Sequence, residues 1–267
     1  MKNLLSILFL LLCSVFYPQT KLISWNLENF GQSKSKIEIE FIVETVREYD
    51  IIAIQEVVAG YGGAQTVAKL ATELNRKGAK WDYVISEPTS GNPHKKERYA
   101  FIWKTAKLKK IGHAWLEKKF HVEIEREPYY CTFQYDNKQF TVVNFHAIPK
   151  SKQPEREIKY FKYLADEYRT LNLIFAGDFN CPESNSVFNP LKKMGYQSIL
   201  AGQKTSLKQK CTNNKCLASE YDNMYYKSSK IRNLNSGVIS FYKNFHSLKE
   251  ARKISDHIPI WFEFSLN

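Results

Sequence analysis

The chain has 267 residues, of which 43% are hydrophobic, so it is long enough to bury a sizeable core as one large domain or two small ones. No internal repeat or low-complexity linker divides it, which excludes a repeat protein. Lysine and arginine number 39 against 27 aspartate and glutamate, and the formal net charge of +12 favours an acidic partner such as nucleic acid, an anionic membrane or a polyanionic glycan.

The N-terminus has the pattern of a secretory signal peptide, with Lys2 ahead of an almost unbroken apolar run from Leu4 to Phe16. At 13 residues, this run is too short to span a bilayer comfortably. We therefore predict a signal peptide over residues 1–19 and one mature domain over residues 20–267. The protein would then be secreted, extracellular or periplasmic, with no stable membrane association; a membrane-anchored form is the alternative.

The first half of the mature chain alternates buried strands with amphipathic helices. Residues 21–26 and 51–55 are apolar enough for buried strands, and the apolar spacing between them predicts a helix over 36–48. This is a strand-helix-strand unit. A second helix is predicted over 65–76, and it is followed by clustered strand candidates at 82–86, 98–104, 107–114, 129–134 and 139–145.

The second half repeats this order. A helix is predicted over 155–169, a strand over 173–176 and a short helix over 187–194. Further strands are predicted at 221–226, 237–242 and 258–264. Two strand-rich halves with helices between them indicate two mixed sheets that pack face to face with helices outside.

Polar groups that suit metal and proton chemistry follow several of these strands. They are Trp25-Asn26, Gln55-Glu56, Gly177-Asp178-Phe179-Asn180 and Ser255-Asp256-His257. Carboxylate and amide oxygens are the ligands that hard divalent cations prefer, and an adjacent Asp-His pair adds a titratable base. A single such motif is typical of a turn or a helix cap, but the ordered set predicts one site built from many strand ends.

Eight motifs follow one another from Ile23 to Phe264, namely WNLENFG, IIAIQEV, KERYAFIWK, REP, NFHA, AGDFN, EYDN and SDHIPIWF. Their order resembles the endonuclease/exonuclease/phosphatase superfamily of metal-dependent phosphodiesterases, and within it the deoxyribonuclease I-like branch. The resemblance implies that residues 20–267 form one catalytic domain. It also implies an α/β fold, a four-layer sandwich of two packed mixed β-sheets flanked by helices, with a cleft at one end of both sheets.

The resemblance also implies a metal site. Glu56 would be the main ligand of a divalent cation, and Asn26 would support both the metal and the phosphate. Asp256 would contact a second metal region. The expected cofactor is Mg²⁺, with Ca²⁺ or Mn²⁺ as alternatives.

By the same resemblance, Asp178 would orient or deprotonate the attacking water, and Asn180 would donate to the phosphate or the transition state. His257 would serve as general base or phosphate donor. Which of Asp178 and His257 takes the proton is left open at this point.

His146 would be the second histidine of the site, with Glu97 as its carboxylate partner. Asp222 would be the corresponding partner of His257. A carboxylate bonded to one ring nitrogen fixes the tautomer of an imidazole and raises its basicity. Two such dyads on either side of a scissile phosphate suit the roles of acid and base.

Arg126 matches an arginine of the branch that contacts phosphate; the alternative is an ion pair with Glu123, Glu125 or Glu127. The chain departs from the pancreatic-type enzymes at two positions, where it has Val58 instead of an arginine and Lys95 instead of a tyrosine. Minor-groove reading by those groups is therefore not expected. We predict that the DNA phosphates are instead contacted by Lys95, Lys96 and Arg98.

The chain has five cysteines, one of which, Cys13, lies in the predicted signal peptide. As in the deoxyribonuclease I branch, a disulfide from Cys181 to Cys211 or Cys216 would staple two loops of the site. Cys131 is predicted to be a buried free thiol. Because no C-x-x-C pair is present, we do not expect the cysteines to bind metal.

These features and the resemblance together predict a secreted, Mg²⁺- or Ca²⁺/Mg²⁺-dependent endonuclease that cuts DNA with little sequence preference. The resemblance implies that it leaves 5′-phosphates. A monomer is expected. One alternative is a phospholipid or inositol-phosphate phosphodiesterase of the same superfamily; another is a non-catalytic protein that binds polyanions on this scaffold. The choice between DNA and RNA, and between single and double strands, is left open.

Overall fold

The computed structural model describes residues 19–91 and 96–267. The predicted signal peptide therefore lies outside the described residues except for Gln19, and Lys95 lies outside them as well. Among the helices that are described, we find none with both the length and the apolar character needed to cross a membrane.

The first β-sheet is built around the N-terminal strand-helix-strand unit. Its six strands lie in the order β13 (Ile231–Val238), β14 (Ile260–Leu266), β1 (Thr20–Phe30), β2 (Ile51–Val58), β4 (Glu97–Lys104) and β3 (Trp81–Ile85). The central pair β1 and β2 is parallel, and the other neighbouring pairs are antiparallel. The sheet is thus mixed.

The second β-sheet repeats this plan. Its six strands lie in the order β5 (Lys109–Leu116), β6 (Tyr129–Tyr135), β7 (Lys138–His146), β8 (Leu173–Asp178), β12 (Asp222–Lys227) and β9 (Tyr196–Ser198). Again one central pair, β7 and β8, is parallel, and the flanking pairs are antiparallel.

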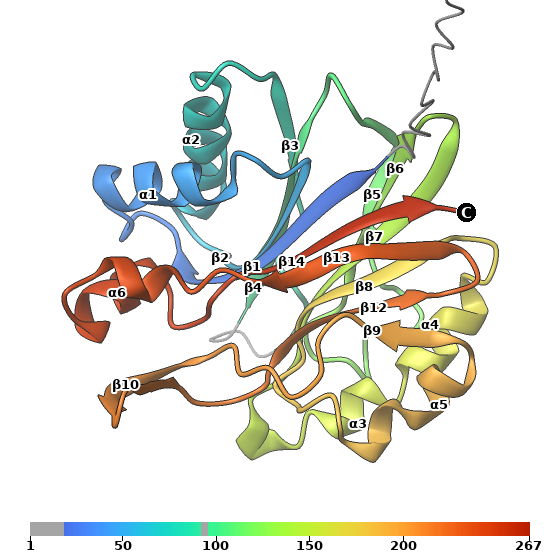
Figure 1. The fold of residues 1–267 in the computed structure, drawn as a ribbon. Helices are drawn as coiled ribbons and strands as arrows, with labels where there is room; N and C mark the ends of the chain where they lie inside the picture. Colours follow the sequence, from blue (N-terminus) through green and yellow to red (C-terminus); the bar gives the residue numbers. More distant parts are fainter. Residues whose placement is uncertain (1–18, 92–95) are drawn as a thin grey trace, which may run out of the picture.

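Helices cover the outer face of each sheet (Figure 1). The first sheet carries α1 (Lys36–Val46), α2 (Gly63–Asn75) and α6 (Leu248–Ile254). The second sheet carries α3 (Glu155–Ile158), α4 (Phe161–Glu167) and α5 (Asn189–Lys193). Short 3₁₀ segments occur at η2 (Lys150–Lys152), η3 (Ser186–Phe188) and η4 (Phe241–Asn244).

Three separate hydrophobic cores lie between the four layers. On β2, Ile52 and Ile54 face the helices, whereas Ile51 and Ala53 face the other sheet. Central strands are therefore buried on both faces, which is why they are continuous apolar runs rather than alternating ones. The predicted α/β fold, a four-layer sandwich of two mixed sheets flanked by helices, is confirmed.

Two predicted elements differ clearly from the structure. The helix predicted over 155–169 is two helices, because tighter bonds of the i to i+3 type, such as Tyr160 N to Glu157 O at 3.0 Å, interrupt it. The strand predicted at 237–242 is instead β13, which ends at Val238. This edge strand carries exposed polar residues, so it gives little apolar periodicity.

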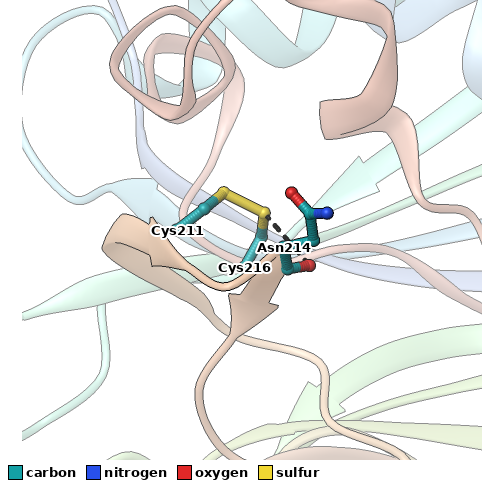
Figure 2. The surroundings of a disulfide bond; sticks show 3 residues. All are labelled: Cys211, Asn214 and Cys216. Atoms are coloured by element: carbon teal, nitrogen blue, oxygen red, sulfur yellow. Dashed lines mark hydrogen bonds between the residues drawn. A yellow bond between two sulfur atoms is a disulfide. The ribbon is translucent and has the colours of Figure 1, made fainter.

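A small hairpin of β10 (Leu207–Thr212) and β11 (Lys215–Leu217) forms a third, two-stranded sheet. Figure 1 shows it extending away from the sandwich. A disulfide between Cys211 and Cys216 closes its tip, as Figure 2 shows.

The predicted disulfide from Cys181 is therefore wrong. Cys181 is a free thiol buried in the core between the second sheet and its helices, whereas Cys211 is exposed on the hairpin and pairs with Cys216. A disulfide needs two sulfur atoms close together, and the short hairpin places the sulfur atoms of Cys211 and Cys216 next to each other. Cys131 is a buried free thiol, as predicted.

We expect the disulfide to stabilise the hairpin rather than the sandwich. An isolated two-stranded hairpin is marginally stable, and a bridge that closes so short a loop contributes about 2 kcal/mol through chain entropy. In a Cys211→Ser/Cys216→Ser variant, backbone amides of residues 208–215 should exchange with solvent at least about tenfold faster. Hydrogen exchange measured by mass spectrometry tests this. Equal acceleration in the central strands would contradict a local role.

Candidate active site

The polar residues predicted from the sequence meet at one edge of the two sheets. In each central parallel pair, the carboxyl ends of the strands lie together, and the register places His146 beside Asp178. The antiparallel strands β4 and β12 begin at the same edge, with Glu97 and Asp222 as their first residues. The topology therefore gathers residues distant in sequence.

Glu56 lies at an irregularity of β2, where the pairing register with β4 shifts between Ile54 and Val57. Its φ of 60° is in the left-handed region, which is uncommon for a residue other than glycine. The side chain is 25% exposed and accepts hydrogen bonds from Asn26 Nδ2 at 3.0 Å and from Asn29 N at 3.2 Å. This backbone conformation presents the carboxylate to the open end of the site.

Asp178 is the central anion of the site, with a side chain that is 1% exposed. Its Oδ1 accepts from Asn180 N at 2.8 Å, and its Oδ2 accepts from Asn26 Nδ2 at 3.1 Å. Oδ2 also lies 3.5 Å from His146 Nε2 and 3.6 Å from His257 Nε2. One carboxylate oxygen therefore faces both imidazoles.

The turn at this carboxylate needs glycine before it. Gly177 has a φ of +142°, and a Cβ there would meet Phe145 O at 1.9 Å. Only glycine allows β8 to approach β7 so closely. Gly177 thereby fixes the position from which Asp178 enters the site.

His257 forms the first imidazole–carboxylate dyad, with Nδ1 2.6 Å from Asp222 Oδ2. Burial lowers the pKa of His257, but the charges of Asp222 and Asp178 outweigh it and hold the pKa well above the ordinary value. Its backbone is fixed as well, because His257 N donates to Ser255 Oγ at 3.0 Å and its carbonyl accepts from Trp25 Nε1 at 2.7 Å.

His146 forms the second dyad, with Nδ1 3.0 Å from each oxygen of Glu97. Burial and the Arg126 guanidinium lower the pKa of His146, but Glu97 and Asp178 outweigh them and raise it above the ordinary value. Burial alone would raise the pKa of Glu97, yet His146 and Arg126 together lower it. The dyad is thus a buried, charge-balanced group.

Arg126 is 8% exposed and pairs with Glu97, since its Nη1 donates to Glu97 Oε2 at 3.0 Å. It also donates to the carbonyl of Ala147. The suggested ion pair with Glu123, Glu125 or Glu127 is therefore not the one that forms. Arg126 lies at the wall of an open groove of about 630 Å³, which also contains Glu56 and Lys96.

Arg98 does not enter the site. Its guanidinium donates to the carbonyls of Ala59 at 3.2 Å and Ser86 at 2.7 Å, so it holds two loops together. The sequence could not show these contacts, because every residue has a backbone carbonyl and the residue types do not indicate which carbonyls accept a hydrogen bond. Lys96 is exposed at the groove, and Lys95 lies outside the described residues.

A further carboxylate, Glu28, was not predicted from the sequence. Burial raises the pKa of Glu28, and the charges of Asp256 and Glu56 raise it further. Asp256 is further held by Arg252 Nη2 at 3.4 Å. Glu28 could have been found from the alternation of β1, since residues two apart share a face and Asn26 belongs to the site.

The oxygen-rich side of the site fits a divalent cation. Asn26 Oδ1 is buried and lacks a hydrogen-bond partner within the described residues, and the neighbouring Glu56 carboxylate is partly exposed. These are the hard oxygen donors that Mg²⁺ prefers.

Asp178, Asp222 and His257 also offer atoms within 4.8 Å of one another. However, the raised pKa of His257 favours the protonated ring, and a metal ligand must be deprotonated. Asp222 is in addition committed to His257 Nδ1. Asn26 and Glu56 are therefore the oxygen donors left available to a cation, whereas His257 and Asp222 form a dyad.

Comparison with known proteins identifies a family. The model of the Endonuclease/Exonuclease/phosphatase family matches residues 23–257. Deoxyribonuclease gamma of Rattus norvegicus is 28% identical over 271 residues, covering 91% of this chain and 84% of the relative. A deoxyribonuclease of Thioalkalivibrio sp. (strain K90mix) is 25% identical over 282 residues, covering 98% of this chain and 75% of the relative.

Solved structures share the fold at lower identity. The catalytic domain of human Nocturnin has a TM-score of 0.65 at 15% identity, covering 94% of this chain and 96% of that chain. A mannosyl-6-phosphatase of Bacteroides thetaiotaomicron has a TM-score of 0.65 at 17% identity, covering 92% and 99%. These likenesses support the sandwich fold and do not distinguish between substrates.

The raised pKa of His257 predicts how stability depends on pH in the metal-free protein. Because the folded-state pKa is above the unfolded value of about 6.5, protonated His257 contributes stability that is fully present below that pH. This contribution is lost as the pH rises through the folded-state pKa. Asp222→Asn should shrink the loss by removing the carboxylate nearest to the ring.

Urea unfolding in EDTA between pH 6 and pH 9 measures this effect. Asp166→Asn, a change at an exposed position, is the matched control. Its free energy of unfolding should fall with rising pH by the same amount as that of the wild type. If the free energy of unfolding fell by the same amount in Asp222→Asn as in Asp166→Asn, the dyad would not be the source of the pH dependence.

Proposed function

This chain belongs to the endonuclease/exonuclease/phosphatase family, in its deoxyribonuclease I-like branch, and we propose that it is a secreted, Mg²⁺-dependent endonuclease that cuts DNA with little sequence preference. The observation that carries the proposal is a pair of imidazole–carboxylate dyads whose Nε2 atoms face one carboxylate oxygen, at 3.5 and 3.6 Å. Such a group can take one proton and deliver another within a single reaction.

Glu56 and Asn26 would hold the cation, and Asp256 with Glu28 would add negative charge on the same side. A bound Mg²⁺ would neutralise charge on the phosphoryl oxygens of the substrate. Asn26 has a second task, because its amide nitrogen donates to both Glu56 and Asp178. It therefore fixes the spacing between the metal-binding side and the dyads.

The dyads would handle the protons. In hydrolysis, a water oxygen forms a bond to phosphorus while the bond from phosphorus to O3′ breaks, which leaves a 5′-phosphate and a 3′-hydroxyl. The proton of the water passes to the group formed by Asp178 and one imidazole. The other imidazole, held protonated by its own carboxylate, donates a proton to the leaving oxygen.

Asn180 would assist at the phosphate. Its φ of 49° is in the left-handed region, which asparagine tolerates, and its Nδ2 donates to Ala147 O at 3.0 Å. The side chain is thereby held beside Asp178 without a counter-charge of its own. A neutral donor at this point can bond a phosphoryl oxygen as negative charge develops.

The substrate assignment needs an experiment because other phosphodiesters suit the same chemistry. We propose DNA on the basis of the deoxyribonuclease relatives and the net charge of +12. Purified protein assayed on plasmid DNA, RNA and sphingomyelin, with and without EDTA, tests it. DNA cleavage that EDTA abolishes is the expected result, whereas cleavage of sphingomyelin alone would favour the lipid phosphodiesterase.

Export is the second part of the proposal. It rests on the charged start and apolar run within residues 1–19. Expression of the full chain followed by N-terminal sequencing of the medium or periplasm tests it. A mature protein beginning near residue 20 is expected, and an uncleaved chain in the cytoplasm would contradict export.

Glu56→Gln should lower the rate of DNA cleavage by at least about 10²-fold. Even outer partners of metal ligands cost 10- to 100-fold when removed, and this residue would bind the cation directly. The measurement is cleavage across a Mg²⁺ titration, with the exposed Glu40→Gln as control. A Glu56→Gln rate equal to that of the control would remove Glu56 from the metal site.

His146→Ala and His257→Ala should each lower the rate by about 10² to 10⁴, the usual scale for positioned acid–base groups. Because both rings face Asp178 and serve one step, the double variant should lose less than the product of the single losses. Single-turnover cleavage measures all three. Normal cleavage by either single variant would refute the two-dyad mechanism.

A further inference from the structure

The disulfide-closed hairpin is strongly basic. Residues 203–218 contain four lysines and neither aspartate nor glutamate. Three of these lysines are exposed and Lys208 is half-buried; the set is Lys204, Lys208, Lys210 and Lys215. The hairpin therefore concentrates positive charge at one place on the surface.

The hairpin lysines also have no acidic partner among the described residues, in contrast to several lysines elsewhere on the surface. Elsewhere, Lys107 pairs with Asp50 at 2.6 Å, and Lys150 pairs with Glu155. Within residues 19–91 and 96–267, no ion pair involves any of the four hairpin lysines. Their charge is uncompensated and is available to an external anion.

The hairpin is joined directly to the active site. Leu207 N donates to Asp256 O at 2.6 Å, and Ile258 N donates to Thr205 O at 2.8 Å. The side chain of Thr205 in turn accepts from Asp222 N at 2.9 Å. The base of the hairpin thus bonds the residues on both sides of His257 and the backbone of its carboxylate partner.

The site itself carries more acidic than free basic groups. Its carboxylates are Glu28, Glu56, Glu97, Asp178, Asp222 and Asp256. The neighbouring arginines are already committed, Arg126 to Glu97, Arg98 to two carbonyls, and Arg252 to Asp256 and to Leu207 O. Lys96 is the exposed basic group at the groove, so a further basic surface beside the site would add binding energy for a polyanion.

The shape of the hairpin suits this task. A strand rises about 3.3 Å per residue, so the six residues of β10 extend about 20 Å. Duplex DNA carries a phosphate every 1.7 Å or so along its axis, counting both strands. The hairpin can therefore follow the backbone for about half a turn, and the disulfide between Cys211 and Cys216 keeps its tip in one conformation.

We propose that the hairpin of residues 204–217 is an arm that binds the phosphate backbone of duplex DNA beside the cleaved bond. This inference rests on the proposed nuclease function and names the surface by which that site holds its substrate. The contacts are to phosphates, so the arm adds affinity without sequence preference.

The test compares two triple variants of the full mature protein. Lys208→Ala/Lys210→Ala/Lys215→Ala removes charge from the arm. Lys109→Ala/Lys138→Ala/Lys230→Ala removes the same amount of charge from exposed positions. These positions lie at the strand ends farthest from the active site. Binding to a fluorescent 24-base-pair duplex is measured in EDTA, so that cleavage does not interfere, from 20 to 200 mM salt.

The arm variant should show a slope of log K against log salt that is shallower by about two to three units, since each lost phosphate contact removes about 0.9. The control variant should keep the wild-type slope. Hydrolysis of bis(p-nitrophenyl) phosphate with Mg²⁺ should be equal in all three proteins, because this small ester does not reach the arm.

Equal slopes in the arm and control variants would overturn the proposal. If the arm variant instead lost binding to phosphatidylglycerol vesicles while its DNA binding was unchanged, the arm would be a membrane-binding surface. Failure of the nuclease function has a different signature, in which wild-type protein with Mg²⁺ leaves plasmid DNA intact. Plasmid cleavage by the wild type together with equal slopes therefore removes the arm and leaves the enzyme.

Discussion

The buried carboxylate of Asp178 is the constraint on which the site depends. An anion that is 1% exposed is costly unless charged or hydrogen-bonding partners surround it. Here those partners come from both halves of the molecule, because Asn26 lies in the first sheet and His146 in the second. The requirement to satisfy one oxygen therefore holds the ends of the two sheets in register.

A buried polar network behind the site supports the same alignment. Gln55 Nε2 donates to Asn144 Oδ1 at 2.6 Å and to Ser24 Oγ at 3.0 Å, and Asn144 Nδ2 donates to Ile54 O at 3.0 Å. These two bonds of Asn144 cross from one sheet to the other within an otherwise apolar interface. In such an interior an unpaired amide costs about 1–3 kcal/mol, so the network favours one relative position of the sheets.

The distribution of charge separates chemistry from binding. The chain is basic overall, yet the site contains six carboxylates, and the arginines nearby are paired with Glu97, Asp256 or backbone carbonyls. Acidic groups attract a cation and raise the pKa of the imidazoles, while they repel a polyanionic substrate. Lysines that have no acidic partner in the described part of the chain lie on a hairpin whose backbone is bonded to Asp256. The fold can therefore hold a cation among its acids and still attract a polyanionic substrate.

The sequence by itself determined the layers and indicated the polar residues that gather at one edge of the sheets. Strands buried on both faces leave apolar runs such as 51–54 and 173–176, and the polar residues that end these runs stand out. Only the tertiary structure decided the partners. Arg98 binds carbonyls, Arg126 pairs with Glu97, and Cys211 bonds Cys216, none of which has a local signal. The hairpin and β13 were missed because exposed polar strands lack periodicity. Partner choice depends on distances set by packing across the whole chain, which neither composition nor spacing encodes.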